Sequence, residues 1–176
     1  TQVYAIAINP TAFVRLETNP GISGGRLISR TGPEEAVTTW HDTISDAVTD
    51  ANEFSQSTIT VWPGIYVENV DLGSKGIHLT STDPASRTIQ EKTVIDANHG
   101  GFAVGVYQNT SEIIIEGFTL THAGVSTLPP ASSRKDAAVA IDINRGSAVI
   151  RHNIITENGN ETENRVAAGI CVILSE

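Results

Sequence analysis

The sequence predicts an all-β fold, a right-handed parallel β-helix (a solenoid) with a short N-terminal capping α-helix. Three observations predict it. Two 22-residue windows repeat the same residues, the apolar positions inside each window alternate, and one amphipathic helical segment precedes them. Short repeated strands joined by tight turns are the sequence pattern of a stacked solenoid. At 176 residues the chain is long enough to bury such a core without disulfides.

The repeat lies in residues 103–124 and 138–159, which align without a gap at an offset of 35 residues. Six pairs of positions are identical: Ala103/Ala138, Val104/Val139, Asn109/Asn144, Ile115/Ile150, Thr121/Thr156 and Gly124/Gly159. Because side chains of a strand alternate between its two faces, the alignment predicts two ladders of stacked residues. The inward ladder contains Val104/Val139, Val106/Ile141 and Ile115/Ile150, and the outward ladder sets Tyr107 directly beside Asp142.

The connections between strands are expected to be tight at some corners and long at one. Gly117 and His152 occupy the same repeat position, and both residue types are able to enter the left-handed region. The segments 82–92, 125–137 and 157–166 are polar and are expected to be loops that leave the same corner of successive coils.

A helix is expected at residues 42–51, with Asp42 as its N-cap. The apolar residues of this segment follow helical spacing: Ile44, Ala47, Val48 and Ala51. An amphipathic helix of this kind can cover the open end of the first coil, which a stacked core requires.

The domain organisation is expected to be simple. Residues 1–41 are interpreted as an N-terminal extension with a strand at Val3–Ile8 and a loop rich in glycine and proline. Residues 42–176 are interpreted as one domain, the capping helix with its coils. Since the sequence stops at Glu176 in the middle of a coil, two residues after the apolar run 170–174, this domain is predicted to be incomplete at its C-terminus.

Composition excludes several classes of partner. Twenty Asp and Glu against eleven Lys and Arg give a net charge of −9, which disfavours nucleic acid and anionic lipid. No apolar run is long enough for a membrane span. The single cysteine, Cys171, cannot form an internal disulfide and is expected to be a buried, inert thiol. The five histidines show no metal-ligand spacing, so neither a metal nor a cofactor is expected.

Residues 43–124 resemble the N-terminal part of the pectin-lyase-like right-handed β-helix superfamily. The matching segments are TISDAVTDAN at 43–52, TITVWPGIYVENV at 58–70, IHLTS at 77–81, TVID at 93–96 and IEGFTLT at 115–121. The superfamily includes pectate lyases, pectin methylesterases, polygalacturonases and many extracellular repeat proteins. The resemblance therefore implies the fold and a secreted or cell-surface location. It is weak for chemistry, because one scaffold hosts many functions.

The catalytic motifs of those enzymes are missing from this sequence. The Asn-Thr-Asp, Asp-Asp and Gly-His-Gly motifs of polygalacturonases are absent, as is the arginine-proline motif of pectate lyases. Where pectin methylesterases place their first catalytic aspartate, the chain reads Thr156-Glu157-Asn158-Gly159-Asn160. No catalytic residue is therefore assigned, and catalytic coils either follow Glu176 or do not exist.

A carbohydrate-binding surface is predicted at Tyr107, Asp142, Asn144 and Arg145. An aromatic face beside a carboxylate, an amide and a guanidinium can stack on a sugar ring and hydrogen-bond its hydroxyl groups. The alternative is an ordinary solvated face of the solenoid. Asn109 and Asn160 match the glycosylation pattern, which is consistent with secretion.

Two functions remain open. The first is an extracellular structural or adhesive module that recognises a polysaccharide or cell-surface glycan. Its apolar last coil is expected to continue into more chain or to stack on another molecule, in the extreme as a filament. The alternative is the N-terminal part of a polysaccharide-degrading lyase, esterase or hydrolase.

Overall fold

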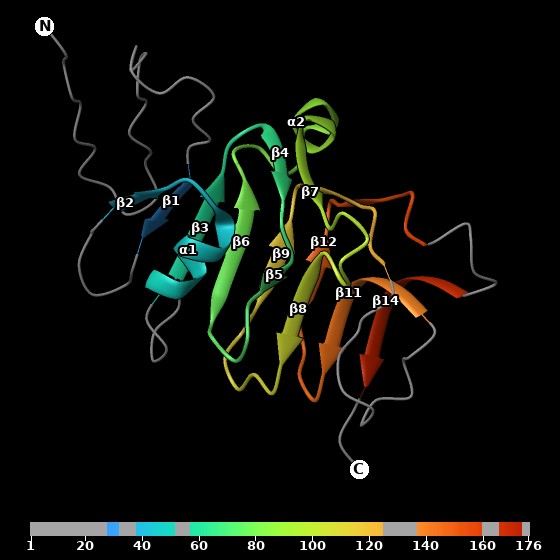
Figure 1. The fold of residues 1–176 in the computed structure, drawn as a ribbon. Helices are drawn as coiled ribbons and strands as arrows, with labels where there is room; N and C mark the ends of the chain where they lie inside the picture. The colour runs from blue at the N-terminus through green and yellow to red at the C-terminus, as the bar shows by residue number, and fades with distance from the viewer. Residues whose placement is uncertain (1–27, 32–37, 52–56, 125–136, 160–165, 174–176) are drawn as a thin grey trace, which may run out of the picture.

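The computed structural model describes residues 28–31, 38–51, 57–124, 137–159 and 166–173 (Figure 1). Short strands dominate these ranges, accompanied by helices α1 (Ile44–Asp50) and α2 (Arg87–Lys92). The strands are β1 Ile28–Thr31, β2 Thr38–His41, β3 Ser57–Val61, β4 Gly64–Val67, β5 Val70–Asp71, β6 Ile77–Ser81, β7 Thr93–Asp96, β8 Val104–Tyr107, β9 Ile114–Glu116, β10 Thr119–Thr121, β11 Ala137–Asn144, β12 Val149–Arg151, β13 Ile154–Ile155 and β14 Val166–Ile173.

The strands form three sheets that the chain visits in turn. Sheet A has the order β12-β9-β6-β3-β1-β2, sheet B the order β13-β10-β7-β4 and sheet C the order β14-β11-β8-β5. From β3 onward, every neighbouring pair in a sheet is parallel and consists of strands from successive coils. Only β1 pairs antiparallel, with β2 and with β3. The predicted all-β class with parallel sheets is confirmed, and the arrangement is solenoid-like.

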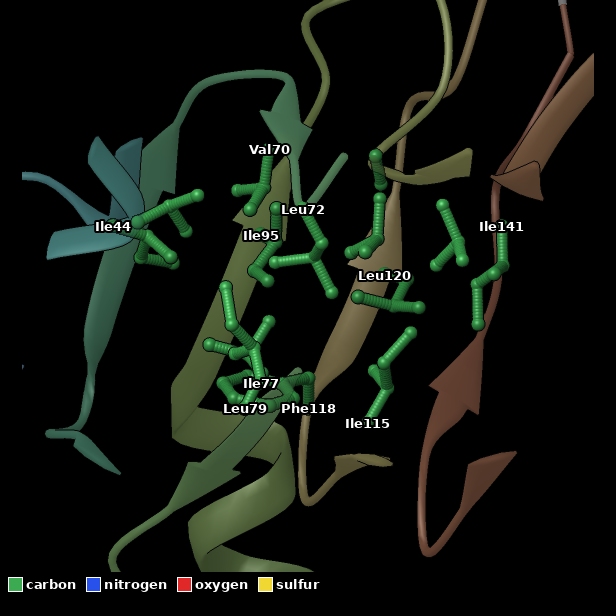
Figure 2. Packing of buried hydrophobic residues seen from close by; sticks show 14 of the residues in the cluster. Ile44, Val70, Leu72, Ile77, Leu79, Ile95, Ile115, Phe118, Leu120 and Ile141 are labelled. Atoms are coloured by element: carbon green, nitrogen blue, oxygen red, sulfur yellow. The ribbon is translucent and has the colours of Figure 1, made fainter. Parts of the chain in front are cut away.

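The core lies between the three sheets and is built from their inward ladders (Figure 2). Sheet A contributes Ile59, Leu79 and Ile115, sheet B contributes Tyr66, Ile95 and Leu120, and sheet C contributes Val70, Val104 and Ile141, all with 0% exposure. Period-2 alternation explains this selection, because every second residue of a strand points to the same face. Burying each large side chain contributes roughly 1.5–3 kcal/mol. The inward ladders are therefore the main source of stability for the stacked coils.

The predicted register is right in sheet A and wrong in sheet C. Ile115 pairs with Ile150, as the 35-residue offset requires. In sheet C, however, Val104 pairs with Ile141, 37 positions later, and Val106 pairs with Ile143. The cause is the turn that follows: it is two residues longer after β8 than after β11. Because a shift of two preserves the side-chain alternation, the same faces still point inward.

Residues with positive φ mark the corners. Gly117 (φ 90°) and His152 (φ 55°) follow neighbouring strands of sheet A, which confirms their predicted left-handed conformation. Only glycine fits at the first of these positions, because an added Cβ would lie 2.1 Å from Ser81 Oγ. Gln108 (φ 51°) and Arg145 (φ 57°) occupy the matching corner after sheet C.

Helix α1 packs against β3 and β5 and so covers the N-terminal end of the core, as predicted. Its apolar residues Ile44, Ala47 and Val48 are buried. The predicted N-cap is wrong: Thr43, not Asp42, caps the helix, and its hydroxyl oxygen accepts a hydrogen bond from the Asp46 amide at 3.0 Å. Thr43 has the extended backbone of an N-cap and stands three residues before the amide it satisfies.

The expectation that the three loops leave one corner is wrong. The segment 82–92 connects β6 of sheet A to β7 of sheet B, whereas the other two segments connect sheet B to sheet C. Residues 82–92 contain helix α2 rather than loop alone, because Gln90 is buried there and donates to the Pro84 carbonyl at 2.7 Å. Residues 125–136 and 160–165 of the other two expected loops, and the strand expected at 3–8, lie outside the described residues. Neither described helix is long and apolar enough to cross a membrane.

Candidate functional site

The predicted carbohydrate-binding residues gather at the end of sheet C. Tyr107 and Asn144 are register partners on the outward faces of β8 and β11, and Arg145 follows at an exposed corner. The predicted pairing of Tyr107 with Asp142 is therefore wrong, because the register of sheet C is shifted by two residues. Asp142 instead pairs with Gly105. It lies on the same outer face of β11 as Asn144, two residues before it.

The accessibility of these residues also differs from expectation. Asp142 is only 5% exposed, although it was expected to project freely outward. The Tyr107 hydroxyl lies 3.5 Å from Asp142 Oδ2, at the outer limit of a hydrogen bond. Tyr107 and Asn144 are half-buried, whereas Arg145 is exposed. A ligand on this surface would therefore meet the tyrosine, the amide and the guanidinium, and the carboxylate would act through the tyrosine.

Phe102 was missed by the sequence reasoning, yet it completes this surface. Its ring meets the Tyr107 ring edge to face, with centroids 6.0 Å apart and an interplanar angle of 63°. The two rings close over Gly105, where an added Cβ would lie 2.8 Å from Phe102 Cε2 and 2.9 Å from Tyr107 Cε2. The missing side chain of Gly105 is thus what allows the pair to form. We call Phe102, Tyr107, Asn144 and Arg145 the aromatic surface.

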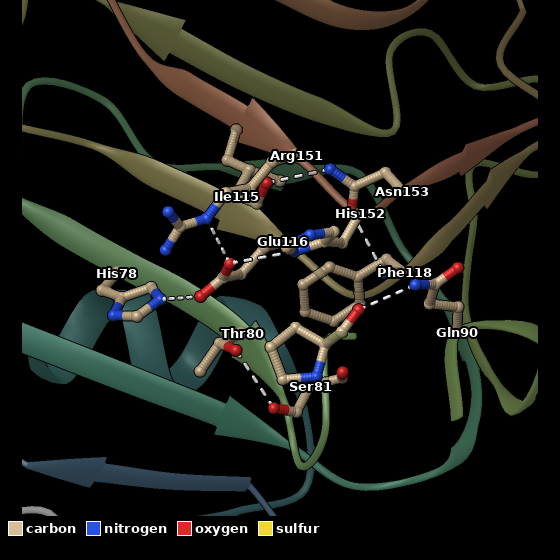
Figure 3. A network of polar contacts seen from close by, with 11 residues as sticks. His78, Thr80, Ser81, Gln90, Ile115, Glu116, Phe118, Arg151, His152 and Asn153 are labelled. Atoms are coloured by element: carbon tan, nitrogen blue, oxygen red, sulfur yellow. Dashed lines mark hydrogen bonds and ion pairs between the residues drawn. The ribbon is translucent and has the colours of Figure 1, made fainter. Parts of the chain in front are cut away.

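A second constellation occupies the outer face of sheet A and centres on Glu116 (Figure 3). Glu116 Oε1 lies 2.7 Å from His78 Nε2, and Oε2 accepts a hydrogen bond from Arg151 Nε at 2.6 Å. His152 Nδ1 is 3.6 Å from the same Oε2. The four residues come from β6, β9, β12 and the corner after β12, so one carboxylate links three successive coils. We call this set the Glu116 cluster.

The electrostatics of the Glu116 cluster favour the ionised carboxylate. Burial alone would raise the pKa of Glu116, whose side chain is only 6% exposed. Hydrogen bonds from Arg151 and His78, together with their charges, nevertheless lower that pKa below its ordinary value. The hydrogen bond and negative charge of Glu116 in turn raise the pKa of Arg151. Each partner of the pair therefore favours the charged form of the other.

The register of sheet A explains why these residues meet. Thr80, Glu116 and Arg151 occupy one outward row across β6, β9 and β12. His78 stands two residues earlier on β6 and reaches the carboxylate diagonally, a distance that long side chains span across a sheet. The signal was present in the sequence, because the correctly aligned pair Ile115/Ile150 places Glu116 beside Arg151.

Another polar group stands at the corner after sheet B. His122 Nδ1 is 3.1 Å from Asp96 Oδ1, and its Nε2 is 3.5 Å from Glu157 Oε2. The His99 ring packs against His122 with centroids 5.3 Å apart. Within the described residues, no group of three or more His, Cys, Asp or Glu side chains is arranged to hold a metal ion.

Cys171 is a free thiol that is partly exposed, so its expected burial is wrong. It pairs in register with Asp142 on the outer face of β14, the last strand of sheet C. A residue in that edge strand has a neighbour on one side only. Partial exposure follows from this position.

No protein-family model, curated protein or solved structure matches this chain.

Proposed function

We propose that this chain is an extracellular, right-handed parallel β-helix module that binds carbohydrate through the aromatic surface and has a structural or adhesive role. The right-handed winding rests on the strong preference of parallel strand crossovers for that hand. The pectin-lyase-like resemblance of residues 43–124 supports the extracellular location. The binding role rests on the geometry of the outer face of sheet C.

One observation carries the binding proposal: Tyr107 stands beside Asn144 in a setting that fixes its ring. Phe102 packs against one edge of the ring, and Asp142 lies close to the hydroxyl group. A rigid aromatic ring loses little conformational entropy when a ligand stacks on it. The neighbouring amide and guanidinium supply donors and acceptors for the hydroxyl groups of a sugar.

The proposal assigns a distinct part to each residue. Tyr107 provides the stacking face for a pyranose ring, while Asn144 and the exposed Arg145 hydrogen-bond hydroxyl or ring oxygens at its edge. Asp142 acts as a positioning residue, because its carboxylate is covered and reaches the ligand only through the Tyr107 hydroxyl. None of these roles requires a chemical step.

The test is a binding titration of the chain with defined oligosaccharides, followed by NMR or calorimetry. Tyr107→Ala should abolish saturable binding, whereas Tyr107→Phe should retain most of it because the ring remains. Trp40→Ala is the matched control, since Trp40 is a partly exposed aromatic residue on sheet A that packs against Trp62. Equal binding by wild type and Tyr107→Ala would show that the aromatic surface is not the carbohydrate-binding site.

An enzymatic role is the alternative, and turnover by the same samples would support it. Incubation with pectate, alginate and related polymers should release neither unsaturated products nor new reducing ends. Clear turnover would instead support the interpretation as part of a polysaccharide-degrading enzyme.

We further propose that the chain self-associates through its last coil. Ile170 and Val172 occupy inward rows of sheet C, yet they are 44% and 52% exposed, because within the described residues no strand follows β14 in that sheet. Apolar residues at the edge of a sheet favour pairing with another chain. The opposite end of the core is covered by α1, so the partner proposed here is the same end of a second copy.

A further inference from the structure

The Glu116 cluster concentrates groups that can carry positive charge in an otherwise acidic protein. The chain has a net charge of −9, yet one guanidinium and two imidazoles surround the Glu116 carboxylate on sheet A, and Glu112 is a second carboxylate whose charge acts on Arg151. The aromatic surface lies on sheet C and contains none of these residues. The cluster is therefore a separate place in the fold with its own chemistry.

Arg151 uses only part of its hydrogen-bonding capacity. Its Nε donates to Glu116, and among the described residues no acceptor is assigned to the two terminal nitrogens. These nitrogens point away from the carboxylate (Figure 3), and the side chain is 52% exposed. A guanidinium has a second, end-on pair of donors that matches two oxygens of one anion. The bond to Glu116 fixes the orientation of that pair.

The two imidazoles stand on either side of the same carboxylate. His152 is half-exposed, and its left-handed backbone (φ 55°) holds it at the corner directly after Arg151. His78 is 27% exposed and uses Nε2 toward Glu116. His78 donates its Nε2–H to the Glu116 carboxylate, so in the neutral ring its Nδ1 is an acceptor. His152 Nδ1 lies 3.6 Å from Glu116 Oε2, beyond hydrogen-bond distance, so His152 keeps a ring N–H for a further partner.

From this arrangement we infer that the Glu116 cluster binds an oxyanion, a phosphate, sulfate or carboxylate group. The terminal nitrogens of Arg151 form the main contact, and His152 adds a donor beside it. Glu116 does not touch the anion. It is a positioning residue that holds the guanidinium through the 2.6 Å hydrogen bond from Arg151 Nε.

The test uses inorganic phosphate, sulfate and acetate, titrated separately into the full chain at fixed pH and ionic strength. NMR of the imidazole signals follows each titration, with calorimetry as the second measurement. We expect saturable shifts of His78 and His152. Stronger binding of phosphate and sulfate than of acetate assigns a tetrahedral anion, and the reverse order assigns a carboxylate. Absence of saturation with all three anions would overturn the inference.

Variants make the test specific. Arg151→Gln should weaken binding about tenfold, the loss of one charge-assisted contact, and Arg151→Lys should lie between it and wild type. Arg87→Gln is the matched control, because Arg87 forms an exposed pair with Glu91 on α2. Equal weakening by both glutamine variants would show only general charge attraction and would contradict a site. Tyr107→Ala should leave phosphate binding unchanged. A negative result for the anion site would therefore not count against the carbohydrate proposal, and the reverse also holds.

Discussion

Glu116 shows at the scale of a residue how a solenoid tolerates a carboxylate in a nearly buried position. The residue faces outward, yet His78, Arg151 and His152 cover it. Removing a charge from water costs several kcal/mol unless hydrogen bonds replace the lost hydration. Here two hydrogen bonds from neighbouring coils do so, and the pKa of Glu116 is lowered despite its burial. The cluster therefore contributes to cohesion between coils as well as to the proposed anion site.

This lowered pKa predicts a pH dependence of stability. A carboxyl group whose folded-state pKa is depressed contributes stability that is complete above its unfolded pKa and is lost as pH falls through the folded pKa. Glu116→Gln should reduce the free energy of unfolding at neutral pH by about 1–3 kcal/mol. The difference between wild type and variant should shrink as the pH is lowered below about 4.3. Urea unfolding at a series of pH values measures this difference in unfolding free energy. A difference that does not change with pH would contradict the lowered pKa of Glu116.

Gly105 offers a test of the ring pair in the aromatic surface. In Gly105→Ala the new methyl group meets the far ends of the Phe102 and Tyr107 rings, which can move apart. We expect oligosaccharide affinity to fall several-fold. Because Gly105 is buried, the overlap of the methyl group with the two rings should also lower the free energy of unfolding by about 1–3 kcal/mol. The matched control is Gly169→Ala on β14, where the added Cβ makes only an ordinary contact with Ile155. If Gly105→Ala and Gly169→Ala lose oligosaccharide affinity equally, the contact between the Phe102 and Tyr107 rings does not contribute to binding.

The residues of the candidate site could be predicted from the sequence only in part. Alternation alone placed Tyr107 and Asn144 on an outer face, and the structure agrees. Their pairing could not be derived, because identity between the windows is compatible with a local shift of two residues. Asp142 was misjudged for a different reason: alternation reports the face of a side chain but not what covers that face.

Asn109 illustrates the same limit for a modification motif. Its amide nitrogen donates to the carbonyls of Ser111 and Ser147, both at 2.8 Å, and its oxygen accepts from the Ser147 amide at 2.9 Å. The side chain thus ties one corner to the next. The glycosylation pattern at Asn109 therefore overlaps a structural role, because a glycan on that nitrogen would replace one of its two donated hydrogen bonds.

At the scale of elements, α1 is held at both ends by charged side chains of the first coil. Glu68 accepts from the amides of Ile44 at 3.0 Å and Ser45 at 2.9 Å, at the helix N-terminus. Lys75 Nζ donates to the carbonyls of Val48, Thr49 and Ala51, at the C-terminus, over 2.8–3.2 Å. Both charges complement the helix dipole and satisfy backbone groups that a seven-residue helix leaves unpaired.

Removing either contact should loosen the cap. Glu68→Gln and Lys75→Met are each expected to lower the free energy of unfolding by about 1–2 kcal/mol, through lost charge-assisted hydrogen bonds. Amide exchange should rise first in residues 44–50, since a short helix has little stability of its own. Lys92→Met, at an exposed lysine in the last turn of α2, is the control and should change neither quantity. Unchanged exchange in both cap variants would show that apolar packing alone holds α1.

Some elements were accessible to prediction and others were not. The segments 77–81 and 93–96, which belong to the superfamily resemblance, coincide with β6 and β7. Helix α2 was missed, since its six residues are too few to show helical periodicity. β1 and β2 were missed as well: they are antiparallel additions to sheet A and share nothing with the repeat that predicted the coils.

At the scale of the whole molecule, the two ends of the stack differ. Figure 1 shows α1 and the antiparallel strands at one end and β14 at the other. The first end is covered by α1, whereas the inward rows of the last coil remain exposed at Ile170 and Val172. Head-to-tail stacking into a filament would have to displace α1. Association of two last coils requires no such displacement, so the expected assembly is a closed pair rather than a fibre.

This asymmetry leads to a test of assembly. The 176-residue chain should form a concentration-dependent dimer in sedimentation velocity, without larger species. Ile170→Asp and Val172→Asp should each shift it to monomer, because a carboxylate buried in an apolar contact carries a large desolvation cost. Val67→Asp is the matched control: Val67 is 57% exposed on β4, at the opposite edge of the stack, and its replacement should leave the dimer intact. Filaments in wild type that Val67→Asp abolishes would instead show that the α1 end takes part. A wild-type chain that stays monomeric at high concentration would exclude self-association, and the exposed rows of β14 would then be surfaces for another partner.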